Sequence, residues 1–382
     1  MILAIFQPKI KEGHLTVQKI FLFLGFFLIT QNLQASSLES SLKKLDQYVK
    51  QQIQKNNVMG CSIAVVDHGQ IAFMKAYGLK KKGGKDKVDL NTAFQLGSAS
   101  KPIAATLIAL LKKQGLINLD ASLNLFYPYL KPTTTLRHVL THTTGFKRTG
   151  WNNKIENNVL RNQLLKDLET SVQGEPGIEF DYHNFVYSLM EGVVQATQNQ
   201  RMDVLLYHKL FMPLGMNQTT IGYEAFLTQP NRAWPHQRNQ KKVLYPSKSY
   251  SKLYHTAVFT AAGINSNIQD MASFLRLQLI GVPGLLNMED LNIFHAPVIE
   301  ANDALLRIKR VLFGETKSYY GMGWRIAETP KKRIVYHGGW VKGFCSFVGF
   351  LPDRKLGIVV LSNSETDFSL KTSLLFLHDW VR

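Results

Sequence analysis

The spacing of apolar residues predicts strands at both ends of the chain and helices over most of the middle. Near the start, apolar side chains recur at helical spacing over 38–55 and predict an amphipathic helix. Short apolar stretches separated by turn residues predict the following strands. The predicted strands are 60–66, 70–74, 333–336, 345–350 and 356–361, with a closing helix over 368–381.

The segment from about 98 to 250 has helix-like spacing broken by Pro and Gly, and it has little strand pattern. Strands at both ends that enclose a helical insertion favour one composite α/β fold of the α+β type. We expect an antiparallel sheet built from both termini and flanked by helices, with an all-helical lobe inserted. The sheet lobe would comprise about 36–97 and 255–382, and the helical lobe about 98–254. The cleft between such lobes is the expected site.

The first 35 residues have the pattern of an export signal. Basic residues Lys9, Lys11 and Lys19 precede an apolar run over 20–29, and the small residue Ala35 follows. The apolar run is short for a membrane span. We therefore predict a signal peptide over 1–35, a single further domain over 36–382, and a periplasmic or secreted location; a retained membrane anchor is the alternative.

The overall composition is that of a globular protein and excludes several other classes. Apolar residues make up 45% and charged residues 19% of the 382 residues. The formal net charge is +18, but the basic residues are scattered and form no basic helix, so no nucleic-acid partner is predicted. Two cysteines make no disulfide framework, and no Cys/His cluster has metal-ligand spacing, which predicts no metal site.

A serine and a lysine separated by two residues form the first candidate catalytic pair. A serine hydroxyl is a poor nucleophile until a base removes its proton. If Ser98 opens the apolar helix that follows it, Lys101 lies one turn later on the same face, where burial can lower its pKa. Only Ser98 follows a glycine and precedes an apolar helix. The same spacing also begins at Ser40, Ser41 and Ser249.

A tyrosine and an asparagine form the second candidate pair, just before a helix-like stretch over 185–195. The phenol of Tyr182, placed near a lysine, is suited to relaying protons as a general acid or base. The amide of Asn184 has both donors and an acceptor and could orient the lysine or the substrate. A capped helix start with a core tyrosine is the alternative interpretation.

A glycine-containing turn after the strand 333–336 is the third candidate. Here the glycines would let a substrate backbone lie against the strand edge. The backbone N–H of Trp340, together with that of Ser98, could form an oxyanion hole, and His337 could hydrogen-bond the substrate or the tyrosine. By itself the segment could equally be an ordinary Gly-rich turn.

Ser-x-x-Lys, Tyr-x-Asn and His-x-Gly, in this order, resemble the serine β-lactamase and penicillin-binding-protein superfamily. The resemblance covers about 40–382 and is closest to the branch of class C β-lactamases, D-alanyl-D-alanine carboxypeptidases and esterases. It implies the fold expected above. Shorter motifs agree, at 140–145, 213–216, 262–266, 320–324 and 361–363.

The resemblance assigns a role to each residue of the first two motifs. Ser98 would be the acylated nucleophile and Lys101 its activator. Tyr182 would pass the proton to the leaving group, and Asn184 would hold the lysine and the substrate. The reaction would be acyl transfer to water through a Ser98 ester, without metal or organic cofactor.

The third motif carries a departure from the family's β-lactamases, which usually have lysine at the position of His337. The resemblance places His337 and Gly339 on the edge strand and gives the second oxyanion N–H to Trp340. A histidine that is neutral near pH 7 holds a substrate carboxylate less firmly than lysine would. His142, in the motif at 140–145, is expected to be a buried turn or helix-cap residue.

Three functions remain in competition. The first is a serine hydrolase acting on an amide or ester, peptidase- or esterase-like, with cell-wall peptide as one candidate substrate. The second is a β-lactamase in the strict sense. The third is a catalytically silent binding protein with the same cleft. The partner is in each case a small molecule or peptide, and the oligomeric state is open.

The resemblance also predicts that Cys61 and Cys345 are not bonded. In the family's sheet their strands are separated by the final strand. Two strand spacings exceed the roughly 7 Å limit between Cα atoms for a disulfide.

Overall fold

The computed structural model describes residues 37–157, 159–240, 243–247, 252, 254, 257–301, 314 and 317–381. Contacts divide the chain into two units, Met1–Tyr48 and Val49–Arg382. The helix expected at 38–55 is assigned over 37–54. The predicted signal peptide lies outside the described residues. In the part that is described, no helix combines the length and the apolar character needed to cross a membrane.

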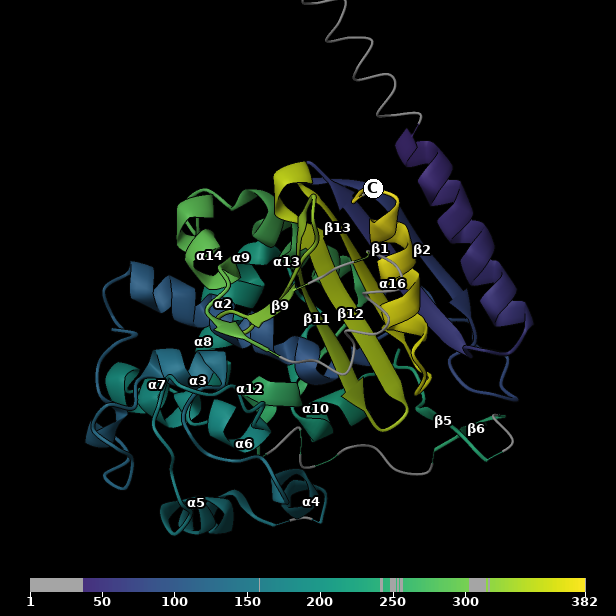
Figure 1. The fold of residues 1–382 in the computed structure, drawn as a ribbon. Coiled ribbons are helices and arrows are strands. Elements are labelled where there is room, and N and C mark those ends of the chain that lie inside the picture. Colours follow the sequence, from purple (N-terminus) through teal and green to yellow (C-terminus); the bar gives the residue numbers. More distant parts are fainter. Residues whose placement is uncertain are drawn as a thin grey trace, which may run out of the picture. The chain divides into compact units, whose positions relative to one another are not determined.

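The second unit is built on an antiparallel sheet to which both ends of the chain contribute, as predicted (Figure 1). The strand order is β2-β1-β13-β12-β11-β10-β9-β8. In chain order the strands are β1 Gly60–Asp67, β2 Gln70–Gly78, β8 Ile299–Glu300, β9 Lys317–Tyr320, β10 Arg325–Glu328, β11 Arg333–Val341, β12 Phe344–Leu351 and β13 Leu356–Ser362.

The central strands are buried on both faces, which explains their continuous apolar runs. In Figure 1, α16 (Phe368–His378) lies over the near face of the sheet and α13 (Ile268–Ile280) lies behind it. The closing helix was expected to extend to 381, but it ends at His378.

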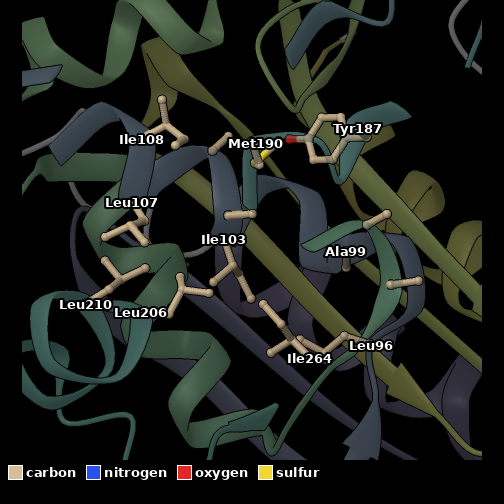
Figure 2. Close-up of a cluster of buried hydrophobic side chains, with 14 of the residues drawn as sticks. Leu96, Ala99, Ile103, Leu107, Ile108, Tyr187, Met190, Leu206, Leu210 and Ile264 are labelled. Carbon is tan, nitrogen blue, oxygen red and sulfur yellow. The ribbon is translucent and has the colours of Figure 1, made fainter. Parts of the chain in front are cut away.

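Helix α2 (Ser100–Lys113) lies at the centre of the helical part. Every residue from Ser100 to Leu111 is buried. Figure 2 shows Ile103 and Leu107 of this helix among buried side chains that come from distant parts of the chain. The other labelled members of this cluster are Leu96, Ala99, Ile108, Tyr187, Met190, Leu206, Leu210 and Ile264. A helix enclosed in this way holds its first turn in a fixed position.

Several shorter helices follow α2 along the chain, and α8, α12 and α14 among them pack against it. The stretch 185–195, expected as one helix, is two: α6 and α7. The remaining helices are α3 Leu136–Thr141, α4 Trp151–Glu156, α5 Arg161–Glu169, α6 Asn184–Tyr187, α7 Met190–Gln198, α8 Met202–Leu206, α9 Met212–Leu214, α10 Tyr223–Thr228, α12 Phe259–Ala262 and α14 Met288–His295. Single turns or short π-helical segments occur at η1 Gly97–Ala99, η2 Leu123–Leu125, η3 Tyr207–Phe211 and η4 Pro352–Arg354.

Several strands were not predicted from the sequence, because they are only two to four residues long and too short to show an alternation of apolar and polar residues. They include β8, β9 and β10 of the large sheet. The others form two small sheets, β3-β7-β4 and β5-β6. Their bounds are β3 Phe94–Gln95, β4 Thr220–Ile221, β5 His236–Arg238, β6 Leu244–Pro246 and β7 Ile264–Ser266.

The prediction for the two cysteines is confirmed, because both are free and buried. Cys61 on β1 and Cys345 on β12 are both paired with Ser362 of the intervening strand β13. The final strand therefore separates them.

Candidate active site

Ser98 lies in the single 3-10 turn η1, and α2 begins two residues later at Ser100. The expectation that Ser98 opens the α-helix is therefore wrong by two residues. The residue before Ser98 is Gly97, whose φ of +54° is costly for other residues. A Cβ at Gly97 would stand 2.7 Å from the Trp340 nitrogen, so this turn packs directly against β11.

The Lys101 amine lies at hydrogen-bond reach of Ser98, as the spacing predicted. Its Nζ is 3.5 Å from Ser98 Oγ, 2.7 Å from Asn184 Oδ1 and 3.0 Å from the Ala261 carbonyl oxygen. The side chain is fully buried. Residues from η1, α2, α6 and α12 thus meet at one nitrogen.

Burial and the positive charge of Arg325 hold the pKa of Lys101 well below its usual value. A neutral amine has two hydrogens and one lone pair. The oxygens of Asn184 and Ala261 accept the two hydrogens, and the lone pair is then left for the Ser98 hydroxyl proton. The arrangement suits a lysine that acts as a general base.

Further hydrogen bonds, partly buried, support both acceptors of Lys101. Asn184 Nδ2 donates to Asn152 Oδ1 at 3.1 Å, which turns the amide oxygen toward the lysine. The hydroxyl of Thr260, next to Ala261 on α12, donates to Glu191 Oε1 at 2.8 Å.

The Glu191 carboxylate extends this support to a second helix. It lies 3.2 Å from the Arg161 guanidinium, which also donates to the Ala257 and Ser188 carbonyl oxygens. Burial raises the pKa of Glu191, and Arg161 opposes that shift. The ion pair therefore joins α5 to α7, and the Thr260 hydrogen bond joins α7 to α12, the helix that carries the lysine's carbonyl acceptor.

Tyr182 is half-buried in the same pocket as Ser98. The Lys101 nitrogen is 4.5 Å from the centre of its ring. Behind it lies His142, whose ring centre is 4.4 Å away. His142 ends α3 in the left-handed conformation, is buried, and accepts a hydrogen bond from the His183 N–H, which is the structural role expected of it.

His337 is buried on β11, where its Nε2 is 3.1 Å from the Tyr320 hydroxyl and its Nδ1 is 2.8 Å from the Gly338 carbonyl oxygen. Tyr320 thus contacts the Nε2 nitrogen, and the ring centre of Tyr182 lies 6.3 Å from that of His337. Burial, then Arg325 and Lys101, hold the pKa of His337 well below its usual value. His337 is accordingly a neutral ring at pH 7.

The fold requires a glycine at position 339, for a reason that could not be predicted from the sequence. A Cβ at this position would stand 1.8 Å from the Leu96 carbonyl oxygen, which also accepts from Ser346 Oγ at 2.6 Å. We expected this glycine to let a substrate backbone lie against the strand. In the structure it allows the Leu96 backbone to lie close to β11. Beyond Tyr336, β10 no longer pairs with β11, so the edge from His337 onward lacks that neighbour.

Arg325 is the site residue that sequence reasoning missed. Its guanidinium lies 5.1 Å from the centre of the Tyr182 ring and 5.8 Å from that of Tyr320. The only sequence signal was its place directly after the glycine-containing motif at 320–324. It brings a permanent positive charge to a site whose histidine is neutral.

Some of these residues line one pocket of about 280 Å³, with Lys101 buried beneath Ser98 and not part of the lining. Its catalytic end contains Ser98, Tyr182, Arg325 and His337. From there it crosses Gly338 and Gly339 and ends between the Trp340 side chain and the start of α16. Among the described residues, no three His, Cys, Asp or Glu side chains are grouped closely enough to hold a metal ion.

Comparison with known proteins identifies the family. The family model described as Beta-lactamase matches residues 45–376. The chain belongs to the Beta-lactamase family. Its proteins include the serine β-lactamases and penicillin-binding proteins, as the three motifs indicated.

Individual relatives are distant. Protein flp of Staphylococcus aureus (strain MW2) is 24% identical over 341 residues, covering 86% of this chain and 64% of the relative. The chain thus spans just under two thirds of that protein's length.

Solved structures of low identity share the fold of this family member. One is the octameric penicillin-binding protein homologue from Pyrococcus abyssi, with a TM-score of 0.76 at 21% identity, covering 88% of this chain and 76% of the homologue. Another is EstCE1, a hydrolase with promiscuous acyltransferase activity, with a TM-score of 0.73 at 18% identity, covering 91% and 98%. At such identities the likeness concerns the fold alone.

Proposed function

We propose that this family member is a serine hydrolase that forms an acyl-enzyme at Ser98, with an amide or ester as its substrate. The observation that carries the proposal is the set of contacts around Lys101 Nζ, which has two oxygen acceptors and lies 3.5 Å from Ser98 Oγ. Ser98 attacks the substrate carbonyl as Lys101 takes its proton. Tyr182 passes a proton to the leaving group, and water then hydrolyses the ester.

The oxyanion of the tetrahedral intermediate is proposed to bind the backbone N–H groups of Ser98 and Trp340. The packing of Gly97 against the Trp340 nitrogen supports this, since it holds the two backbone segments together. Loss of one such donor typically costs about 10²–10³ in rate.

The charge in the pocket favours a substrate with an anionic group near its scissile bond. The neutral His337 is a weak partner for a carboxylate, whereas Arg325 provides a fixed positive charge. The carboxyl end of a cell-wall peptide has this chemistry. Peptidase- or esterase-like action outside the cytoplasm is therefore proposed, in line with the export signal predicted over 1–35.

Purified protein would be incubated with a fluorophosphonate probe, p-nitrophenyl esters, D-Ala-D-Ala peptides and nitrocefin, with Ser98→Ala as the control. We expect covalent labelling and ester or peptide hydrolysis that disappear in Ser98→Ala. Rapid nitrocefin turnover would instead indicate a β-lactamase. Absence of labelling on folded wild-type protein would indicate a silent binding protein and sink the proposal.

A further inference from the structure

The pocket continues past the catalytic residues, across β11, to a second wall formed by the start of α16. Its far end is lined by Trp340 of β11, Cys345 of β12 and Leu370 of α16, whose side chains the mechanism does not use and which are mainly apolar. Thr366, Asp367 and Ser369 also line it, and the Asp367 carboxylate is paired with Lys371 at 2.7 Å.

Gly338 is the point at which the two ends join. Alternation along β11 places Gly338 and Trp340 on the same face, opposite Phe347 and Cys345 of β12. A Cβ at Gly338 would meet nothing closer than the Ser346 carbonyl oxygen at 3.8 Å, and its φ is not in the left-handed region. The fold therefore has room for a side chain at position 338. Because the residue there is glycine, the two ends of the pocket remain connected.

The far walls are fixed in place by hydrogen bonds. The Trp340 indole Nε1 donates to Glu365 Oε1 at 3.0 Å, while Glu365 Oε2 accepts from the Gly343 N–H at 3.0 Å. Ser369 Oγ donates to the Cys345 carbonyl oxygen at 3.1 Å and ties the first turn of α16 to β12. The Trp340 side chain remains 56% exposed, so one side of a rigid aromatic surface is available to a ligand.

We propose that the space between Trp340 and Leu370 is a substrate subsite that binds an apolar group next to the scissile bond, reached from Ser98 across Gly338. The inference rests on the proposed function and narrows its substrate class. Such substrates are esters or amides with an anionic group toward Arg325 and an aromatic or alkyl group toward Trp340. A pocket of about 280 Å³ has room for a chain of several carbons beside the reacting group.

The test compares ratios of kcat/KM for bulky and small substrates in the full chain. One series varies the acyl group, from p-nitrophenyl acetate to p-nitrophenyl octanoate. The other varies the alcohol, from methyl acetate to 1-naphthyl acetate. The variants are Gly338→Val, which fills the passage, and Leu370→Ala, which removes one wall. Leu375→Ala is the matched control, since Leu375 lies on the same helix, is 39% exposed and is not part of the pocket lining.

In at least one series we expect the bulky-to-small ratio to fall about tenfold in Gly338→Val and in Leu370→Ala, the effect of losing contact with about two methylene groups. Leu375→Ala should keep the wild-type ratio. Ratios within about twofold of wild type for both pocket variants in both series would overturn the subsite. Fluorophosphonate labelling of Ser98 in every variant separates that result from a failure of the hydrolase proposal, in which the wild type itself is unlabelled.

Discussion

The two ends of the pocket are held in different ways. At the catalytic end, polar groups from η1, α2, α6, α12 and β11 converge, and Lys101 has buried hydrogen-bond partners from two of these elements. At the far end, Trp340 and Leu370 are apolar walls, anchored through hydrogen bonds of Glu365 and Ser369. Changes at the first end should therefore affect chemistry, whereas changes at the second should affect the choice of substrate.

The largest effect is expected on catalytic activity, from Lys101→Met at the catalytic end. The substitution removes the base but keeps a long side chain in the buried space, so turnover of p-nitrophenyl acetate should fall about 10³-fold. Because the buried oxygens of Asn184 and Ala261 lose their donor, the free energy of unfolding in urea should also fall, by about 1–3 kcal/mol. Retained turnover would show that another group activates Ser98.

A smaller effect, on stability, should separate the neighbouring glycines of β11. Gly339→Ala would place a methyl group against the Leu96 carbonyl oxygen and should reduce the free energy of unfolding by about 1–3 kcal/mol. Gly338→Ala meets no such neighbour and should change it by less than about 0.5 kcal/mol. Urea denaturation measures both. Equal losses of unfolding free energy would contradict the inference that the fold does not require a glycine at position 338.

The smallest effect is expected from Arg325→Gln, read from the pH dependence of kcat/KM for an uncharged ester. The base acts as a neutral amine, so activity falls as pH drops through the pKa of Lys101. Burial is the main cause of that lowered pKa and Arg325 the second. Removing the guanidinium should raise the pKa and move the acidic limb of the profile to higher pH. A limb that moves to lower pH would contradict this electrostatic coupling.

Much of the fold and part of the site could be predicted from local pattern. The long strands β1, β12 and β13 have apolar runs from which they could be predicted, whereas β8 to β10 are too short. Only 333–336 of β11 was predicted as strand; the glycines that follow favoured a turn, but the strand continues to Val341. The pair Ser98 and Lys101 could be predicted because one turn of chain separates them. Arg325 and the Ala261 carbonyl could not, since their place beside the lysine depends on how β10 and α12 pack against α2.

The order of residues along the chain was enough to specify the strands at both ends, the three motifs and the chemistry that a serine, a lysine and a tyrosine offer. Packing decided the rest: which oxygens take the lysine's hydrogens, why Gly339 must lack a side chain, and where the open passage leads. The physical reason is the distance along the chain over which each interaction acts. The spacing of apolar residues determines helices and strands over a few residues, whereas burial and electrostatic fields depend on neighbours that only the folded chain brings together.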